Sequence, residues 1–235
     1  MPGKERTYTI DGIELPSVTT ILNIIDKPWL SAWQKKEMGA AIRTELLSTQ
    51  LPEDEIKRID VLDEIIKQAK KIPALIGKEA MSLGTKIHQA IEDYSLGKDV
   101  EITDDVKIGL ASFKLWRQES GMTLLEAERV VYDKDLGYAG TADAIYEDNF
   151  GRKFIFDYKT SSSGIVSDSY ALQVAAYAAA YPDVINGAYV LMLNKSGKPD
   201  FKIHNVNLFE SFKAFASALE LYKKIKGGNL WIQQN

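Results

Sequence analysis

The apolar residues of the chain follow two periods, one on each side of Gly121. Up to Gly121 they recur mainly at the three- and four-residue spacing of helices. The exception is a short alternating stretch, YTIDGIEL, whose Asp-Gly pair predicts a hairpin over residues 7–15. Proline and glycine positions then predict helices over residues 16–25, from residue 28 to about 47, from residue 52 onward, from residue 73 to about 96, and from about 104 to 120.

After Gly121 the pattern changes to a period of two, which predicts strands. Three of them follow one another, TLLEAERVVY, YAGTADAIYE and RKFIFDYK, and an alanine-rich helix ends before Pro182. Two more strands, GAYVLMLN and FKIHNVNL, precede a last helix over residues 209–226. A strand, a crossover helix and a further strand imply one parallel pair inside an antiparallel meander.

The fold class that we expect is therefore α/β. A mixed β-sheet core of order βββαβ would be flanked by helices, with a mostly helical N-terminal addition. We expect a single domain over residues 1–235, with the hairpin and helices in 1–121 and the sheet core in 122–235.

Composition excludes several kinds of chemistry. The 235 residues include no cysteine, so disulfides, thiolate zinc sites and iron–sulfur clusters are ruled out. The formal net charge of −4 argues against a protein that coats nucleic acid through bulk electrostatics. No apolar run reaches the roughly 20 residues of a membrane span, and the first ten residues lack the apolar stretch of a signal peptide. We therefore expect a cytoplasmic protein without a membrane partner.

The candidate chemistry lies in the segment FIFDYKTSS. Asp157 and Lys159 share one face at the end of an apolar strand, where burying two charges is costly unless they form an ion pair or a site. The same triplet form, Asp105-Val106-Lys107, lies at a predicted helix start and indicates only a solvated first turn.

The preceding strand adds a third charge, Asp143. If the two strands pair around the turn DNFG, Asp143 and Asp157 come side by side, with Lys159 beyond them. Two adjacent carboxylates repel each other unless a cation lies between them, which favours Mg²⁺ or Mn²⁺ and the chemistry of phosphodiester hydrolysis. The alternative is an Asp–Lys salt bridge beside a turn-capping aspartate.

Three short motifs follow one another along the chain: Gly140-x-x-Asp143, Asp157-x-Lys159 and Gln173-x-x-x-Tyr177. Their order resembles the PD-(D/E)XK nuclease superfamily and its RecB-like exonuclease branch. The segment GTKIHQAIEDY supplies the upstream histidine of that branch, and YTIDGIELPSVTTIL resembles phage exonucleases and the mitochondrial genome maintenance exonuclease. Ala142 stands where the family name has proline.

The resemblance implies a role for each matched residue. Lys159 would be the catalytic lysine, and the metal ligands would be His88, Asp143, Asp157 and the backbone carbonyl of Tyr158. Glu128 would support the metal or the lysine, with Glu126 as the alternative. Gln173 and Tyr177 share a helix face toward the site. Without the resemblance, a structural role would be the better interpretation of His88, and Tyr177 would suit core packing equally well.

Two further groups are candidates for DNA contacts. Thr160 and Ser161 follow the lysine and could donate to phosphate oxygens, or could simply end the strand. Lys35 and Lys36 lie near Trp29 and Trp33 in a helical segment that we expect to form a wall or arch over the site. The alternative for the two tryptophans is core packing.

The expected function is that of a Mg²⁺- or Mn²⁺-dependent deoxyribonuclease, an exonuclease that acts on strand ends and single-stranded DNA in phage replication or recombination. DNA would be its partner, with a phage recombination or single-strand-binding protein as a second one in the host cytoplasm. A structure-specific or restriction-type endonuclease and a catalytically inactive nucleic-acid-binding module are the alternatives.

Overall fold

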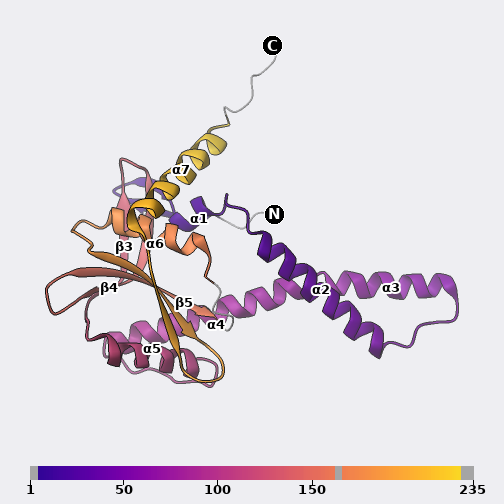
Figure 1. Ribbon diagram of the computed structural model, residues 1–235. Helices are drawn as coiled ribbons and strands as arrows, with labels where there is room; N and C mark the ends of the chain where they lie inside the picture. The colour runs from indigo at the N-terminus through magenta and orange to yellow at the C-terminus, as the bar shows by residue number, and fades with distance from the viewer. Residues whose placement is uncertain (1–4, 162–165, 229–235) are drawn as a thin grey trace, which may run out of the picture. The chain divides into compact units, whose positions relative to one another are not determined.

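Figure 1 shows a computed structural model of the protein, which describes residues 5–161 and 166–228. The chain forms two compact units. The core unit comprises residues Met1–Ile25 and Lys86–Asn235, and the helical unit comprises Asp26–Thr85. No helix in the described ranges is long and apolar enough to cross a membrane.

The core unit is built on one five-stranded sheet in the order β3-β4-β5-β6-β7. All neighbouring pairs are antiparallel except β5 and β6, which are parallel because α6 (Asp168–Ala180) connects them. The mixed α/β sheet and its βββαβ order are thus confirmed. The strands are β3 (Thr123–Asp133), β4 (Tyr138–Glu147), β5 (Lys153–Ser161), β6 (Gly187–Asn194) and β7 (Phe201–Asn205).

Helices cover both faces of this sheet (Figure 1). On one face, α1 (Val18–Leu22), α6 and α7 (Leu208–Gly227) share a buried apolar cluster with Ile155 and Val190. On the other face, α5 (Lys107–Ser120) places Trp116 5.0 Å from the ring of Phe156. Successive residues of β5 therefore face different layers, and both layers are buried.

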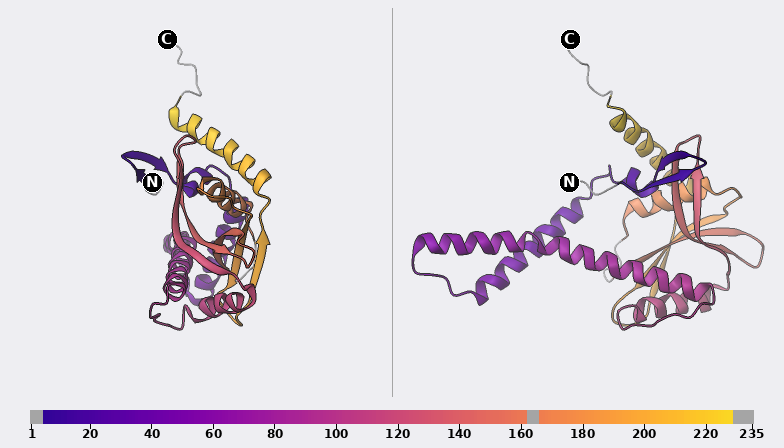
Figure 2. Two further views of the ribbon diagram at one scale, coloured as in Figure 1. Left: turned by 90° about the vertical axis from the view of Figure 1, so that its left-hand side faces the viewer. Right: turned by 180° about the vertical axis from the view of Figure 1, so that it is seen from behind.

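The N-terminal hairpin is attached to β4 of the core unit (Figure 2). Asp11 and Gly12 both have positive φ, 48° and 80°, as the two-residue turn between β1 (Thr7–Ile10) and β2 (Ile13–Pro16) requires. The Tyr8 hydroxyl lies 2.9 Å from Oγ1 of Thr141 in β4. The predicted hairpin is confirmed, and it ends beside the strand that carries Asp143.

The helical unit contains α2 (Pro28–Ser48), α3 (Glu55–Ala69) and the first part of α4 (Ile72–Ser95). Pro28 is in the first turn of α2 as predicted, whereas α3 begins three residues after Pro52 because the Asp54 side chain caps it. No residue of α2 is buried, and Trp29 is 55% exposed. The alternative that Trp29 is a core residue is therefore wrong.

Candidate active site

The site lies where β4 and β5 stop pairing. Their ladder runs from Glu147–Lys153 to Ala144–Phe156, and its register places Asp143 opposite Asp157 at the next position. There the side chain of Asp143 replaces a backbone acceptor, because its Oδ2 accepts a hydrogen bond from the amide of Tyr158 at 2.6 Å. The two aspartates are neighbours across adjacent strands, as the sequence predicts.

A third carboxylate continues the same row. The register of β3 with β4 pairs Ala127 with Ala144 and Arg129 with Ala142, so Glu128 lies opposite Asp143. Glu128, Asp143 and Asp157 thus occupy matching positions on three adjacent strands. Like charges this close raise one another's pKa unless a cation neutralises them.

The side chains of Glu128 and Glu126 have different surroundings, because the backbone conformation changes at Glu128. Glu128 has a positive φ of 48°, which breaks the regular alternation of the strand. Its neighbour Glu126 accepts a hydrogen bond from the Tyr181 hydroxyl at 2.5 Å and pairs with Arg129 at 3.1 Å. Glu128 lines a small cavity together with Asp143. Of the two candidates, only Glu128 is placed beside the aspartates.

His88 approaches the row from α4. Its Nδ1 lies 3.7 Å from Oδ2 of Asp143, and its ring meets the ring of Tyr158 edge-on at 6.1 Å between centroids. Glu92, one helical turn after His88, lines the same cavity. Glu92 is not among the site residues predicted from the sequence, although its spacing of four residues from His88 places both on one helix face.

Lys159 forms a close ion pair with Asp157. Its Nζ lies 2.5 Å from Oδ2 of the carboxylate and 5.1 Å from the centre of the Tyr170 ring. The contact does not have hydrogen-bond geometry, and Asp157 Oδ2 has no hydrogen-bond partner among the described residues. Asp157 is 1% exposed and the Lys159 side chain 21% exposed, so only the lysine reaches the surface.

The predicted pair on α6 completes the surroundings of Asp157. Gln173 Nε2 donates to Oδ1 of Asp157 at 3.0 Å and to the Tyr177 hydroxyl at 2.9 Å. Tyr177 is itself buried, and a β-carbon on Gly140 would lie 2.2 Å from its ring atom Cε1. Gly140 is therefore needed to make room for this ring. Tyr177 combines the core position with contact to the site.

Burial and like charges shift the titration of the acidic row. The pKa of Glu128 is raised to about 7, first by burial and then by the charges of Asp143 and Glu92. The pKa of Asp157 is raised to about 6 by burial, partly offset by Lys159 and reinforced by Asp143. Burial lowers the pKa of Lys159, but the charges of Asp157 and Asp143 outweigh it and the net pKa is raised. Lys159 is a cation at neutral pH.

These residues fit a hard divalent cation in kind and in charge. Carboxylate oxygens and one imidazole are the available donors, and Oδ2 of Asp157 has no hydrogen-bond partner among the described residues besides its ion pair with Lys159. Within the described ranges, no three His, Asp or Glu side chains converge closely enough to enclose an ion. Mg²⁺ is commonly held by one or two carboxylates with waters filling the remaining positions, so Asp143 and Asp157 meet that requirement without a full protein cage.

The remaining predicted residues make no contact with the row that the structure describes. Thr160 and Ser161 are the last residues of β5 and pair with Leu193 and Asn194 of β6, while Ser162 lies outside the described residues. Lys35 and Lys36 are exposed on α2 of the helical unit, and their relation to the site stays a prediction. Asp105 of the second triplet is exposed and pairs with Lys86 at 2.7 Å, as a solvated helix start should.

Comparisons with known proteins give no family assignment. No family model matches the chain, and no curated protein sequence matches it. Several solved structures are similar at low identity, among them the following three crystal structures. The protein SSO0001 has a TM-score of 0.35 and 14% identity over 84% of this chain and 88% of its own. A putative exonuclease from Eubacterium rectale has a TM-score of 0.45 and 14% identity, and the match covers 63% of this chain and 69% of that one. An alkaline exonuclease from Laribacter hongkongensis has a TM-score of 0.41 and 13% identity, and the match covers 92% of this chain and 94% of that one. At this similarity, the case for function depends on the side chains of this chain alone.

Proposed function

We propose that the protein is a Mg²⁺- or Mn²⁺-dependent deoxyribonuclease that hydrolyses phosphodiester bonds from DNA strand ends. The observation that carries the proposal is the row of Glu128, Asp143 and Asp157 with Lys159 paired to its last member. Placing these carboxylates side by side is costly for folding, because like charges repel and the buried member, Asp157, also loses solvation. Its benefit lies in binding a cation and a phosphate together.

Each side chain has a role in this proposal that follows from its contacts. The Tyr158 amide holds Asp143 in one orientation, and Gln173 holds Asp157 in one orientation. A bound divalent ion would be held by Asp143 and Asp157, with His88 beside them, and would supply charge neutralisation at the phosphate and a more acidic water. The backbone carbonyl of Tyr158 completes the proposed ligand set.

Lys159 acts on the phosphate or on the attacking water. Its pKa is raised by the two aspartates, so its ammonium group is a donor and not a proton acceptor at neutral pH. From its partly exposed position it can donate to a phosphate oxygen or orient the water, and it stabilises the negative charge that grows as the phosphorus–oxygen bond forms.

The proposed DNA substrate, biological process and protein partner are supported by the sequence motifs. The resemblance to phage exonucleases supports action on single strands or strand ends in phage DNA replication or recombination. It also supports a recombination or single-strand-binding protein as partner. Trp33, Lys35 and Lys36 on α2 would contact the strand, and Thr160 and Ser161 would contact phosphate oxygens.

The test is cleavage of oligonucleotides labelled at either end, single- and double-stranded, with Mg²⁺, Mn²⁺ or chelator. We expect nucleotides to be released from an end only when metal is present, and a circular single strand to remain intact. Asp143→Ala, Asp157→Ala and Lys159→Ala should each abolish cleavage while the circular dichroism spectrum stays that of a folded protein.

The second triplet provides a matched control. Asp105→Ala with Lys107→Ala removes the same two residue types from an exposed helix start and should leave cleavage unchanged. Full activity in any of the three site variants would refute the assignment. Cutting of the circle would show an endonuclease, and metal-independent binding without hydrolysis would show a binding module.

A further inference from the structure

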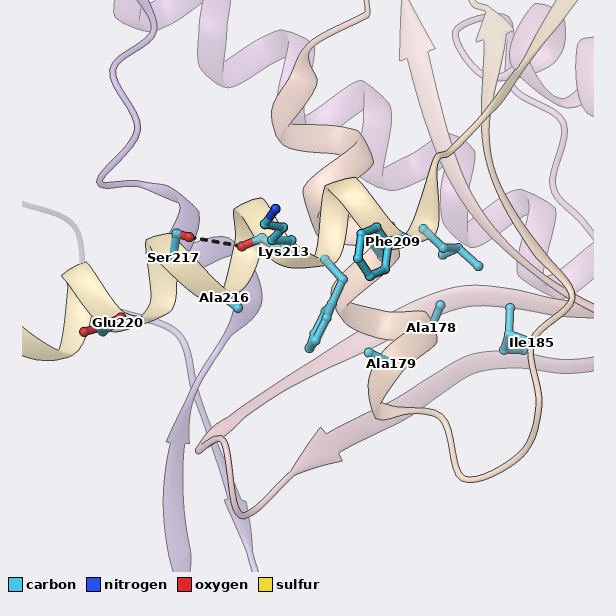
Figure 3. Close-up of a pocket in the computed structure, with 11 residues that line it drawn as sticks. Ala178, Ala179, Ile185, Phe209, Lys213, Ala216, Ser217 and Glu220 are labelled. Carbon is cyan, nitrogen blue, oxygen red and sulfur yellow. Dashed lines mark hydrogen bonds between the residues drawn. The ribbon is translucent and has the colours of Figure 1, made fainter.

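An apolar groove lies between α6 and α7, away from the row of carboxylates. Its α6 side consists of Ala175, Ala178 and Ala179, with Ile185 from the following loop. Figure 3 shows the opposite wall, where Phe209, Lys213, Ala216 and Glu220 follow one another along α7. The Ser217 hydroxyl donates to the Lys213 carbonyl at 3.1 Å, so it is satisfied within the helix and presents little polarity to the groove.

The α7 wall has the spacing of a helix–helix seam. Phe209, Lys213, Ala216 and Glu220 are separated by four, three and four residues, which keeps them on one stripe of the helix. The small Ala216 and Ser217 at the middle allow another helix to approach closely. Phe209 leaves 74% of its surface exposed at one end of the stripe, which is costly for so large an apolar side chain.

The charges on this stripe are arranged symmetrically about its middle. Lys213 lies three residues before Ala216, and Glu220 lies three residues after Ser217. Glu220 pairs with Lys224 of its own helix at 2.9 Å, whereas Lys213 forms no ion pair within residues 5–161 and 166–228. A helix related by a two-fold axis at this middle would run antiparallel and present Glu220 to Lys213, and Lys213 to Glu220.

We propose that α7 and the groove beside it form a self-complementary interface with a second copy of this chain. In this register Ala216 and Ser217 of the two copies would face each other at the middle, and each Phe209 would pack on the aliphatic part of the second copy's Lys224. The two Lys213–Glu220 contacts would fix the antiparallel register, because a parallel pairing would place like charges together.

The interface can be tested by sedimentation velocity of the full chain over a wide range of protein concentrations. We expect reversible dimer formation in the wild type. Lys213→Glu alone or Glu220→Lys alone creates two like-charge contacts and should raise the dissociation constant by about tenfold. Because the interface is self-complementary, the double variant Lys213→Glu with Glu220→Lys should restore it.

A control variant distinguishes specific association through α7 from nonspecific association of exposed apolar side chains. Phe209→Ser should also weaken association, whereas Phe150→Ser, which removes an 83% exposed ring from the β4–β5 turn, should not. A wild type that stays monomeric at every concentration, or a double variant that fails to recover the association lost in the single ones, would overturn the proposal. The measurement is independent of cleavage, so it stands or falls separately from the nuclease assignment.

Discussion

The ring of Tyr177 occupies the space that a side chain at Gly140 would need. A β-carbon there would lie 2.2 Å from Cε1 and 2.9 Å from Cδ1 of the ring, well inside contact distance. Through Gln173, the hydroxyl of the same ring is connected to Asp157. The glycine of one motif, the tyrosine of a second and the aspartate of a third are thus linked by packing and hydrogen bonds.

Gly140→Ala should destabilise the protein by about 1–3 kcal/mol, because the buried ring cannot move without displacing its neighbours. Equilibrium unfolding in denaturant measures the effect. The same substitution made in a Tyr177→Ala background should cost much less. Gly39→Ala serves as the control, since no atom lies within 4 Å of its β-carbon and helix propensity favours alanine there. Equal costs of Gly140→Ala in both backgrounds would contradict the explanation.

Gln173→Ala should lower the rate of cleavage by about ten- to a hundredfold, because Asp157 loses the donor that orients it. The loss should appear in kcat rather than in KM. The variant should also need a higher pH for activity, since a carboxylate that loses a hydrogen bond has a higher pKa. Gln118→Ala on the exposed side of α5 should change neither kcat nor the pH profile. An unchanged pH profile in Gln173→Ala would indicate a structural role alone.

Glu128 should make the metal-free protein less stable as the pH rises. Its pKa in the folded protein is raised from 4.5 to about 7, so the folded state holds the proton more tightly than the unfolded state. Its contribution is fully present below pH 4.5 and is lost as the pH rises through about 7. Glu128→Gln should therefore raise the unfolding midpoint at pH 8 relative to the wild type, and much less at pH 4.

The contribution of Glu128 is measured as the difference between the variant and the wild type, because other groups also make stability depend on pH. Surface carboxylates such as Asp148, whose pKa is lowered in the folded protein, stabilise it as the pH rises. Glu101→Gln, an exposed change, should shift the midpoint equally little at both pH values. Adding Mg²⁺ or Mn²⁺ should remove most of the destabilisation in the wild type, since the cation binds only the folded row. An unfolding midpoint of the wild type that is the same at pH 8 with and without the metal would argue against cation binding by this row.

Lys35→Glu with Lys36→Glu should weaken binding of single-stranded DNA and leave the unfolding transition unchanged, because both lysines are exposed on α2. The slope of affinity against salt concentration should fall by about one for each phosphate that the variant no longer neutralises. Lys195→Glu with Lys198→Glu, in the turn between β6 and β7, changes the charge equally and should have a smaller effect. Equal binding by the two double variants would refute a strand path along α2.

Most of the sheet could be predicted because its signals are local. Period-two runs separated by short turns mark all five strands, and the Asp-Gly turn of the N-terminal hairpin requires positive φ at both of its residues. Helix ends were less predictable. α5 begins at Lys107 instead of about Asp104, and α1 stops at Leu22 instead of Ile25, because apolar spacing and proline positions do not determine where the helical hydrogen bonds begin and end.

Part of the candidate site could likewise be predicted from the sequence, and part could not. The pairing of Asp143 with Asp157 follows from turn length and strand register, both of which the sequence contains. The choice between Glu126 and Glu128 depends on one left-handed backbone conformation at a non-glycine residue, for which the sequence has no marker. The exposure of Trp29 depends on what packs against α2, and apolar spacing alone does not determine that.

The row of carboxylates draws one member from each of three strands, and the glutamine that orients the last one comes from the helix that follows. No short peptide of this chain contains the arrangement. During synthesis, β5 stays an open edge until β6 has emerged, and β6 ends at Asn194. The chemistry proposed for the row would therefore begin only after β6 has been made, so a nascent chain that has not reached Asn194 would be harmless to nucleic acid.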